Sequence, residues 1–333
     1  SGSYRRQVPP HRIRRFRCLH CLVTFSSQTF STTYYLKRPD ILPKLMTMTV
    51  GSMANRQIAD HLRVSPTTVD RQLARLGRHC LLFHEQVRRS LRPPAVIAVD
   101  GFESFELSQY HPFHFHLAVD NLSAVFLGFT DSPLRRKGRM TAYQKRRRAE
   151  LEARWGRPDP HAVRKDVREL LEIVTKKAKQ MIVRTDDHKV YPGIMRGLDC
   201  QITHLVTSSQ ERRDNRNPLW EINHLDMFIR HSCGGHKREG IAWPKRRGAS
   251  ALRLAVFMVW RNSVNQRWQK RCRGTPAMQA GLCDRPLTPC EVLKQRIFVS
   301  RIDLPERWQQ YYWGEVRTPA LGVNRRHELK YAT

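Results

Sequence analysis

Three acidic residues stand where a fold could bring their carboxylates to one point. Asp100 ends the apolar run AVIAVD, and Asp186 follows MIVRT. Glu221 lies in NPLWEINHLDMFIR, which we expect to be a helix that follows the last strand. Converging carboxylates need cations, and hard oxygen ligands favour Mg²⁺ or Mn²⁺. Two such ions about 4 Å apart can activate a water and stabilise the leaving oxygen of a phosphodiester.

Other acids compete for these roles. Asp120 is the strongest competitor because it ends its own apolar run, FHFHLAVD. Asp187 directly follows Asp186 and would face the opposite way off the strand. The remaining competitors are Glu103, Glu106 and Asp226. A lone Asp at a strand end is ordinarily a turn former and a lone helical Glu is ordinarily solvated, so the ordered set indicates a metal site more than any single member does.

The elements that must position these acids follow from the periodicity. Four or five strands are expected between PPAVIAVDGFESFEL and ITHLVTSS, interrupted by a charged helical insert at about 135–180. Helices are expected at NPLWEINHLDMFIRH and at SALRLAVFMVWRNSVNQRW. This pattern predicts an α/β fold with a mixed sheet and flanking helices.

A helix, a tight turn and a second helix are expected in RQIADHLRVSPTTVDRQLARLG. Ser65 is a good N-cap, and Pro66 takes the first helical position. The exposed side of the second helix is expected to carry side chains that suit phosphates and base edges in a major groove: Thr67, Thr68, Arg71, Gln72 and Arg75. A plain helical hairpin with a solvated face is the alternative.

Cys18 and Cys21 enclose a CxxC turn, which could supply two thiolates to a tetrahedral Zn²⁺ site. A structural zinc needs four ligands, and no second cysteine pair lies upstream, so we predict a half site. The alternative is two free thiols. Three later cysteines, Cys272, Cys283 and Cys290, have irregular spacing and are expected to be free thiols.

The composition indicates a polyanionic partner. The 333 residues include 60 Lys and Arg against 29 Asp and Glu, a formal charge of +31. With 40% hydrophobic residues the chain can also bury a core, so we expect nucleic acid rather than disorder as the cause of the charge. No apolar run approaches 18 residues, so no membrane span is expected. The run Arg146, Arg147 and Arg148 would track DNA backbone or form a solvated helix face.

In order along the chain, these motifs resemble those of bacterial insertion-sequence DDE transposases. RRFRCLHCLVTF resembles the second knuckle of a zinc ribbon, and GSMANRQIADHLRVSPTTVDRQLARLG resembles the helix-turn-helix that follows it. Thr185, Asp186 and Tyr191 are similar to the second-aspartate motif, and WEINHLDMFIR is similar to the glutamate motif, with Arg230. The basic segment that follows, REGIAWPKRRGASALRLAV, contains Lys245 and is also similar to the family pattern. The insert at about 135–180 and the tail after 271 have no counterpart in the family.

The resemblance implies an RNase H-like catalytic domain with Asp100, Asp186 and Glu221 as catalytic metal ligands. The resemblance further implies that the protein binds double-stranded DNA, both the element's terminal inverted repeats and the target. The protein would then catalyse strand cleavage and strand transfer. The expected domains are a partial zinc ribbon at 1–38, a helix-turn-helix domain at 39–92, the catalytic domain at 93–270 and a C-terminal extension at 271–333. We expect the protein to form a homo-oligomer. We also expect it to be a bacterial cytoplasmic protein that associates with the nucleoid. A non-catalytic DNA-binding regulator derived from a transposase is the alternative.

Overall fold

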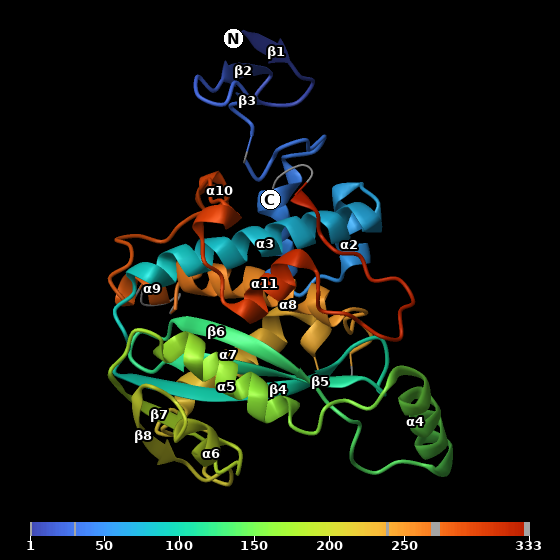
Figure 1. Ribbon diagram of the computed structural model, residues 1–333, viewed down its shortest axis with the longest axis vertical. Helices are drawn as coiled ribbons and strands as arrows, with labels where there is room; N and C mark the ends of the chain where they lie inside the picture. The colour runs from blue at the N-terminus through green and yellow to red at the C-terminus, as the bar shows by residue number, and fades with distance from the viewer. Residues whose placement is uncertain (1, 30, 238–239, 268–273, 330–333) are drawn as a thin grey trace.

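A small antiparallel sheet at the N-terminus stands apart from the rest of the molecule (Figure 1). The computed structural model describes residues 2–29, 31–237, 240–267 and 274–329. The sheet consists of β1 (Ser3–Arg5), β2 (Arg12–Arg17) and β3 (Thr24–Ser26). Phe16 and Phe25 are paired across β2 and β3, and their rings stack with centroids 5.4 Å apart. This sheet has little buried surface, because most of its side chains are exposed.

Three helices follow: α1 (Ile41–Val50), α2 (Asn55–Leu62) and the long α3 (Pro66–Ser90). As the sequence predicts, α2 and α3 are joined by a short turn, residues 63–65. Arg63 adopts a left-handed conformation with φ of 52°, and Ser65 caps α3 by accepting a hydrogen bond of 3.1 Å from the Thr68 amide. The apolar faces of α1, α2 and the start of α3 enclose a small separate core that includes Ile58 and Val69.

The central sheet is mixed and has the order β6-β5-β4-β7-β8. Its strands are β4 (Val96–Phe105), β5 (Pro112–Asp120), β6 (Phe126–Pro133), β7 (Gln180–Thr185) and β8 (Gln201–Val206). The first three form an antiparallel meander, and β7 and β8 then run parallel to β4. The predicted α/β class with a mixed sheet is therefore confirmed, and the arrangement is compatible with an RNase H-like fold.

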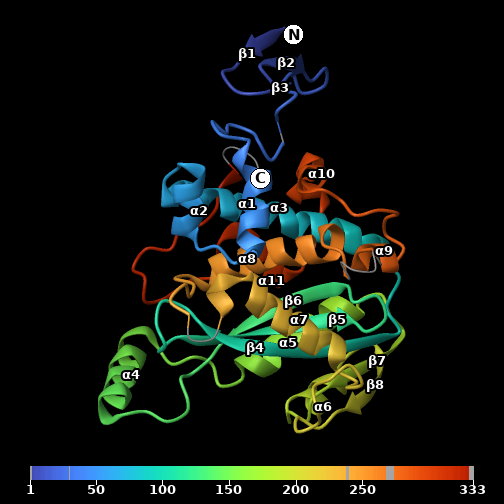
Figure 2. The ribbon, with the colours of Figure 1, turned by 180° about the vertical axis from the view of Figure 1, so that it is seen from behind.

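Helices cover both faces of this sheet (Figures 1 and 2). One face packs on α5 (Ala162–Thr175) and α6 (Tyr191–Met195) through Ile97, Val99 and Val183. The opposite face, which includes Ala98 and Phe102, packs on α7 (Trp220–Ser232) and α8 (Arg247–Val259), with α3 beyond them. The two faces alternate along β4, as the period of two in a strand requires.

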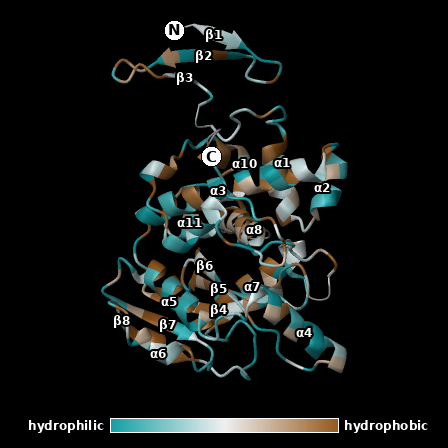
Figure 3. Ribbon diagram, turned by 45° about the vertical axis from the view of Figure 1, so that its right-hand side comes forward, coloured by the Kyte–Doolittle hydropathy of each residue, from teal (hydrophilic) through white to brown (hydrophobic). Residues whose placement is uncertain are grey.

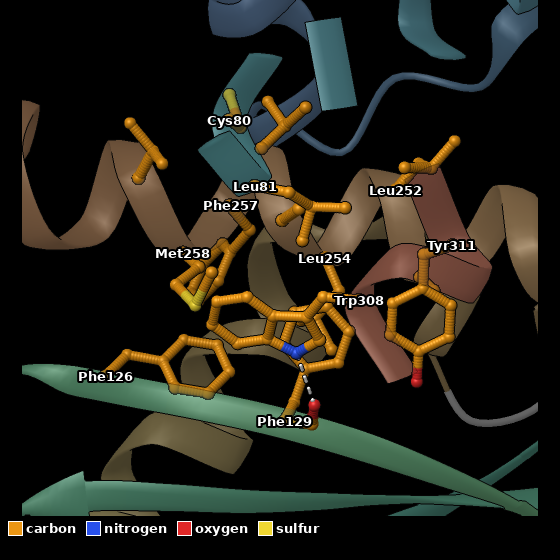
Figure 4. Packing of buried hydrophobic residues seen from close by; sticks show 14 of the residues in the cluster. Cys80, Leu81, Phe126, Phe129, Leu252, Leu254, Phe257, Met258, Trp308 and Tyr311 are labelled. Atoms are coloured by element: carbon orange, nitrogen blue, oxygen red, sulfur yellow. Dashed lines mark hydrogen bonds between the residues drawn. The ribbon is translucent and has the colours of Figure 1, made fainter. Parts of the chain in front are cut away.

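The C-terminal segment is part of the main core and not a separate extension. After α8 come η2 (Trp260–Val264), α9 (Pro276–Gln279), α10 (Pro289–Lys294), the 3₁₀ turn Val299–Arg301 and α11 (Glu306–Trp313). Trp308 and Tyr311 of α11 are fully buried between the sheet and α3 and α8 (Figure 4). The Trp308 indole donates a 3.0 Å hydrogen bond to the Phe129 carbonyl of β6. Cys272 lies outside the described residues.

The predicted insert at about 135–180 divides into two helices with different roles. The first, α4 (Ala142–Trp155), has no buried residue, is largely hydrophilic and projects from the body (Figure 3). The second, α5, belongs to the core, because Val167, Leu170 and Leu171 pack on the sheet. Only the region of α4 is therefore an arm. Among the helices that the structure describes, none is both long and apolar enough to cross a bilayer.

Several buried histidines make the fold sensitive to acid. Burial lowers the pKa of His84 to about 4, of His114 to about 4 and of His236 to about 3. Below the unfolded pKa of about 6.5, the unfolded chain therefore binds protons that the folded chain does not. Each such histidine costs about 1.4 kcal/mol of unfolding free energy for every pH unit below that value, until its folded pKa is reached.

Three carboxyl groups act in the opposite direction. Burial raises the pKa of Asp100 and of Asp166 to about 6 and also raises that of Glu221, so their protonation adds stability as the pH falls. Burial lowers the pKa of His79 and His116 as well, so the histidines outnumber these carboxyl groups and we expect the free energy of unfolding to fall between pH 6.5 and 4.5. Urea titrations at several pH values measure this, and His84→Gln should reduce the slope. A stability that is flat over this interval would contradict the account.

Candidate active site

Asp100 lies on β4, and Asp186 is the first residue after β7, the parallel neighbour of β4. The register of β4 and β7 pairs Ala98 with Arg184. Continued for two residues, one beyond the end of β7, this register would bring Asp100 level with Asp186, and neighbouring strands are about 4.8 Å apart. Asp100 pairs with Leu117 of β5, whose side chain belongs to the core beneath α7. Since residues level across a sheet share a face, both carboxylates are expected on the side that α7 covers.

The face of α7 that packs on the sheet carries Asp226. Ile222, Leu225 and Ile229 are buried against the sheet and define this stripe. Asp226 and Arg230 continue it at helical spacing. The Arg230 guanidinium lies over the Phe102 ring, 5.2 Å from its centroid, and its Nε is 3.2 Å from a carboxylate oxygen of Asp226. Asp226 therefore lies one turn before a residue that sits over β4 close to Asp100.

Glu221 faces another part of the molecule. It lies in the first turn of α7 and forms an ion pair with Arg267. Burial raises its pKa, while Arg267 and Arg261 lower it, and the acid that acts on it electrostatically is Asp120. We predicted that Glu221 would approach Asp100 and Asp186, but the geometry favours its contact with Arg267 instead. Five residues of helix turn Glu221 about 140° from Asp226, so the two acids cannot occupy the same face.

The electrostatics of Asp100 identify its acidic neighbours. Burial raises the pKa of Asp100 to about 6; the Gly101 amide and Arg213 oppose this rise, while Asp186 and Asp226 add to it. Tyr191 is buried nearby, and desolvation followed by the charges of Asp100 and Asp186 raises its pKa well above the usual value. These shifts place a negative charge excess where β4 and β7 meet α7, close to Asp226.

Gly101 permits this arrangement, although sequence reasoning did not single it out. A Cβ atom at this position would lie 1.9 Å from the Phe115 carbonyl oxygen of β5. A side chain here would therefore push β5 away from the strand that carries Asp100. Arg213 was likewise not predicted, and Asp226 was considered only as a competitor of the three predicted acids. The stripe of Ile222, Leu225 and Ile229 was the signal that could have identified Asp226.

The other competing acids have structural roles. Asp120 forms the turn after β5, where its carboxylate accepts the Leu122 amide at 3.0 Å and the Ser123 hydroxyl. Asp187 accepts the amide and the hydroxyl of Ser209, both at 3.2 Å. Glu106 is buried and accepts the Arg247 amide and the Thr318 hydroxyl, each at 2.7 Å, and Glu103 is exposed.

The donor chemistry fits a divalent cation, although the carboxylates are not drawn tightly together. Asp100, Asp186 and Asp226 are all half-buried, so solvent reaches them. Over the described ranges, no three His, Cys, Asp or Glu side chains are close enough to hold a metal ion in this state. The ion pair between Asp226 and Arg230 is one reason, because it holds the third carboxylate against α7.

The predicted DNA-reading residues of α3 differ in availability. Thr67 and Arg71 are exposed, whereas the Thr68 hydroxyl lies 2.9 Å from that of Ser65 as part of the helix cap. Gln72 is half-buried. Arg75 is not on an exposed face: it donates hydrogen bonds of 3.0 Å and 2.7 Å to the carbonyls of Thr32 and Tyr34, and burial lowers its pKa. It therefore ties α3 to the preceding segment.

Alanine substitutions should separate these two arginines. Arg71→Ala should leave the free energy of unfolding unchanged and weaken binding to a cognate duplex by about 1–3 kcal/mol, the value of a guanine contact. Arg75→Ala should lower the free energy of unfolding by about 2 kcal/mol, because it removes hydrogen bonds from a charged donor. Urea denaturation and duplex titration measure the two effects. An equal free energy of unfolding in the two variants would mean that the Arg75 hydrogen bonds do not stabilise the fold.

The other predicted DNA contacts lie at the periphery. Arg146 is exposed on α4, and Arg147 pairs with Glu150 at 2.8 Å. Arg148 is half-buried and donates a 2.9 Å hydrogen bond to the Arg136 carbonyl, so it is less available to DNA. Lys245 is exposed and lies 4.0 Å from the centroid of the Trp243 ring.

Cys18 and Cys21 occupy the turn between β2 and β3. The Cys18 amide donates to the Val23 carbonyl at 2.9 Å and the Leu22 amide to the Cys18 carbonyl at 3.0 Å, which closes the turn. Backbone amides of Cys21 and His20 lower the pKa of Cys18. Neither cysteine is in a disulfide. The turn thus presents two sulfurs, and the part of the chain described here offers them no third ligand.

Comparisons with known proteins give remote structural likenesses, among them the following two. No protein-family model matches the chain, and no curated protein matches it. One similar solved structure is a simian T-cell lymphotropic virus intasome in complex with the PP2A regulatory subunit B56 gamma, with 16% identity, 74% coverage of both chains and a TM-score of 0.29. Another is the catalytic domain of the Mos1 mariner transposase, with 12% identity, a TM-score of 0.18 and coverage of 63% of this chain and 94% of that one. At these scores neither likeness assigns a fold or a function.

Proposed function

We propose that the chain is a DDE-type DNA transposase that catalyses metal-dependent strand cleavage and strand transfer. One observation carries this proposal: Asp100 on β4, Asp186 just after the parallel strand β7 and Asp226 on α7 are close enough for both other acids to act electrostatically on Asp100. The sequence resemblance to insertion-sequence transposases supports it, as does the net charge of +31. Its DNA would be the terminal inverted repeats of the element and a target duplex.

The chain's own residues would hold the cation as follows. Asp100 and Asp186 supply two carboxylates, and the third comes from Asp226 instead of Glu221. Mg²⁺ or Mn²⁺ bound there would activate the attacking water or hydroxyl and stabilise the leaving oxygen. Asp226 must exchange its ion pair with Arg230 for the cation, which frees the Arg230 guanidinium to bind a phosphate of the strand. Arg213, close enough to Asp100 to affect its charge, would bind a second phosphate.

The remaining expectations stay with this proposal. Arg71 and Thr67 on α3 would face a major groove, and Arg146, Arg147 and Lys245 would contact phosphates. The Cys18–Cys21 turn would supply half of a Zn²⁺ site. We further propose a homo-oligomer that acts at the nucleoid in the bacterial cytoplasm.

A DNA-binding regulator without catalytic activity is the second candidate. The observation that favours it is the absence, among the described residues, of three metal-ligating side chains already drawn together. Such a protein would keep the basic surface and the fold but would bind no divalent cation at Asp100 and Asp186.

A cleavage assay distinguishes the two functions. The substrate is a duplex that carries the ends of the DNA element encoding the chain, incubated with Mg²⁺, with Mn²⁺ or with EDTA. The transposase proposal predicts strand breaks at the element ends that expose a 3′-OH, only in the presence of the cation. Tight binding to the ends without cleavage under any metal would favour the regulator.

A further inference from the structure

A cleft with basic and aromatic walls lies on the other side of α7 from Asp226. Its volume is about 550 Å³, within the range of small-molecule sites. The end of α1, α7 and η2 border it. Its principal side chains are Lys237, Arg261, Arg267, His224, Phe228 and Trp260, and no acid is among the described residues that line it. The walls therefore favour an anionic ligand with a flat apolar part.

Arg261 is the main reason to expect a ligand here. It is only 3% exposed, and its Nε and Nη1 atoms find no hydrogen-bond partner among the described residues. Its guanidinium lies over the Phe228 ring, 5.7 Å from the centroid. Burial lowers its pKa to about 10, so it remains charged at neutral pH. A buried cation with unsatisfied donors is costly, and a bound anion would remove that cost.

The nearest acid does not satisfy Arg261. Glu221 forms its ion pair with Arg267, which also donates a 2.8 Å hydrogen bond to Gln279. Glu221 thereby orients Arg267 at the edge of the cleft.

An aromatic column runs along the same side of α7. The rings of Trp220, His224, Phe228 and His231 are stacked in turn, with centroids 5.6, 6.1 and 6.5 Å apart and interplanar angles of 21°, 20° and 15°. Trp260 lies against Phe228 at 5.7 Å. Ring faces beside cations are the features on which proteins stack the bases of single strands.

The backbone around Arg261 is built in an unusual way. After Val259 the helix widens into the π-helical turn η2, Trp260–Val264, a feature that is frequent at functional sites. Asn262 anchors this turn to β6 through two hydrogen bonds of 2.9 Å with the amide and carbonyl of Phe126. The turn is thereby held with Trp260 and Arg261 at the cleft.

We propose that this cleft binds one unpaired nucleotide of a DNA strand, with its phosphate at Arg261 and its base against Trp260 and Phe228. A paired base in a duplex is stacked between its neighbours, so it cannot present its ring face to this cleft unless it leaves the stack. The inference rests on the proposed function for the identity of the strand as DNA.

Binding in EDTA tests the cleft separately from any chemistry. Fluorescence anisotropy of the full chain would use a short single-stranded DNA, the same strand as a duplex, and the single strand with abasic sites. Arg261→Gln should weaken single-strand binding about tenfold and change duplex binding less than about twofold, and Arg261→Lys should lose less. Lys237→Gln, at an exposed position, should show the same preference at about threefold. Arg168→Gln on α5 removes one charge from the other face of the sheet and should change neither affinity.

Thermal unfolding shows whether the Arg261 variants are folded, and Lys237→Gln tests the cleft in any case. Equal loss of single-strand and duplex affinity, or no loss of either, overturns the proposal. So does an abasic strand that binds as well as the intact one, because the cleft would then recognise phosphate alone. Inorganic phosphate that competes as well as a nucleoside monophosphate would have the same meaning. None of these results bears on metal-dependent cleavage, which is measured separately.

Discussion

Replacement of Asp186 by asparagine should abolish Mg²⁺-dependent cleavage of the element ends, with a loss of about 10³-fold or more in rate. An amide oxygen carries no charge and is a poor ligand for a hard divalent cation. Duplex affinity should stay within about twofold, because Asp186 directly follows β7 and does not lie on the helices proposed to read DNA. Single-turnover cleavage and anisotropy on the same duplex measure the two quantities.

Asp187→Asn is the matched control, since it changes the adjacent acid in the same way. The Asp187 carboxylate is bound by Ser209, so this variant should keep cleavage within about fivefold and lose only a little stability. A loss of cleavage in Asp187→Asn together with normal activity in Asp186→Asn would exchange the roles of the two residues.

The second large effect concerns the third carboxylate. Asp226→Asn should lower the cleavage rate by about 10³-fold, whereas Glu221→Gln should lower it by less than about tenfold. Asp226 affects the charge of Asp100, while Glu221 pairs with Arg267 on the far side of α7. Both changes keep the size of the side chain, so they are matched for packing. Single-turnover rates at saturating Mg²⁺ compare them directly.

The opposite ranking would restore Glu221 as the catalytic acid. It would also require α7 to turn when DNA binds, since the present helix buries Ile222, Leu225 and Ile229 against the sheet. Arg230→Gln gives an independent check, because removal of the ion pair with Asp226 should tighten Mn²⁺ binding. An unchanged metal affinity in that variant would exclude competition between Arg230 and the cation.

The two strand aspartates could be predicted from the sequence because their position depends on local patterns. An apolar run that ends in an acid indicates a buried strand with a carboxylate near its end, and parallel pairing then brings Asp100 and Asp186 level. The pairing itself depends on long-range contacts. The α/β class and the helices on both faces followed from the same periodicity.

The third acid and several other assignments could not be fixed in that way. In α7 the choice between Glu221 and Asp226 depends on which face packs on the sheet, and the motif resemblance outweighed the apolar spacing of Ile222, Leu225 and Ile229. Arg75 has the spacing of an exposed residue, but the carbonyls of Thr32 and Tyr34, far away in sequence, hold it. The burial of Trp308 and Tyr311 similarly depends on contacts with β6 and α8, which no local sequence pattern reveals.

Crystals soaked in Mn²⁺ offer the most direct test of the proposed metal centre. The account predicts anomalous density within about 2.3 Å of carboxylate oxygens of Asp100 and Asp186, with Asp226 as the third ligand and Arg230 displaced from it. The density should be absent in crystals of Asp186→Asn. Manganese bound by Glu221 in place of Asp226, or no manganese near Asp100 in the wild-type protein, would contradict the account.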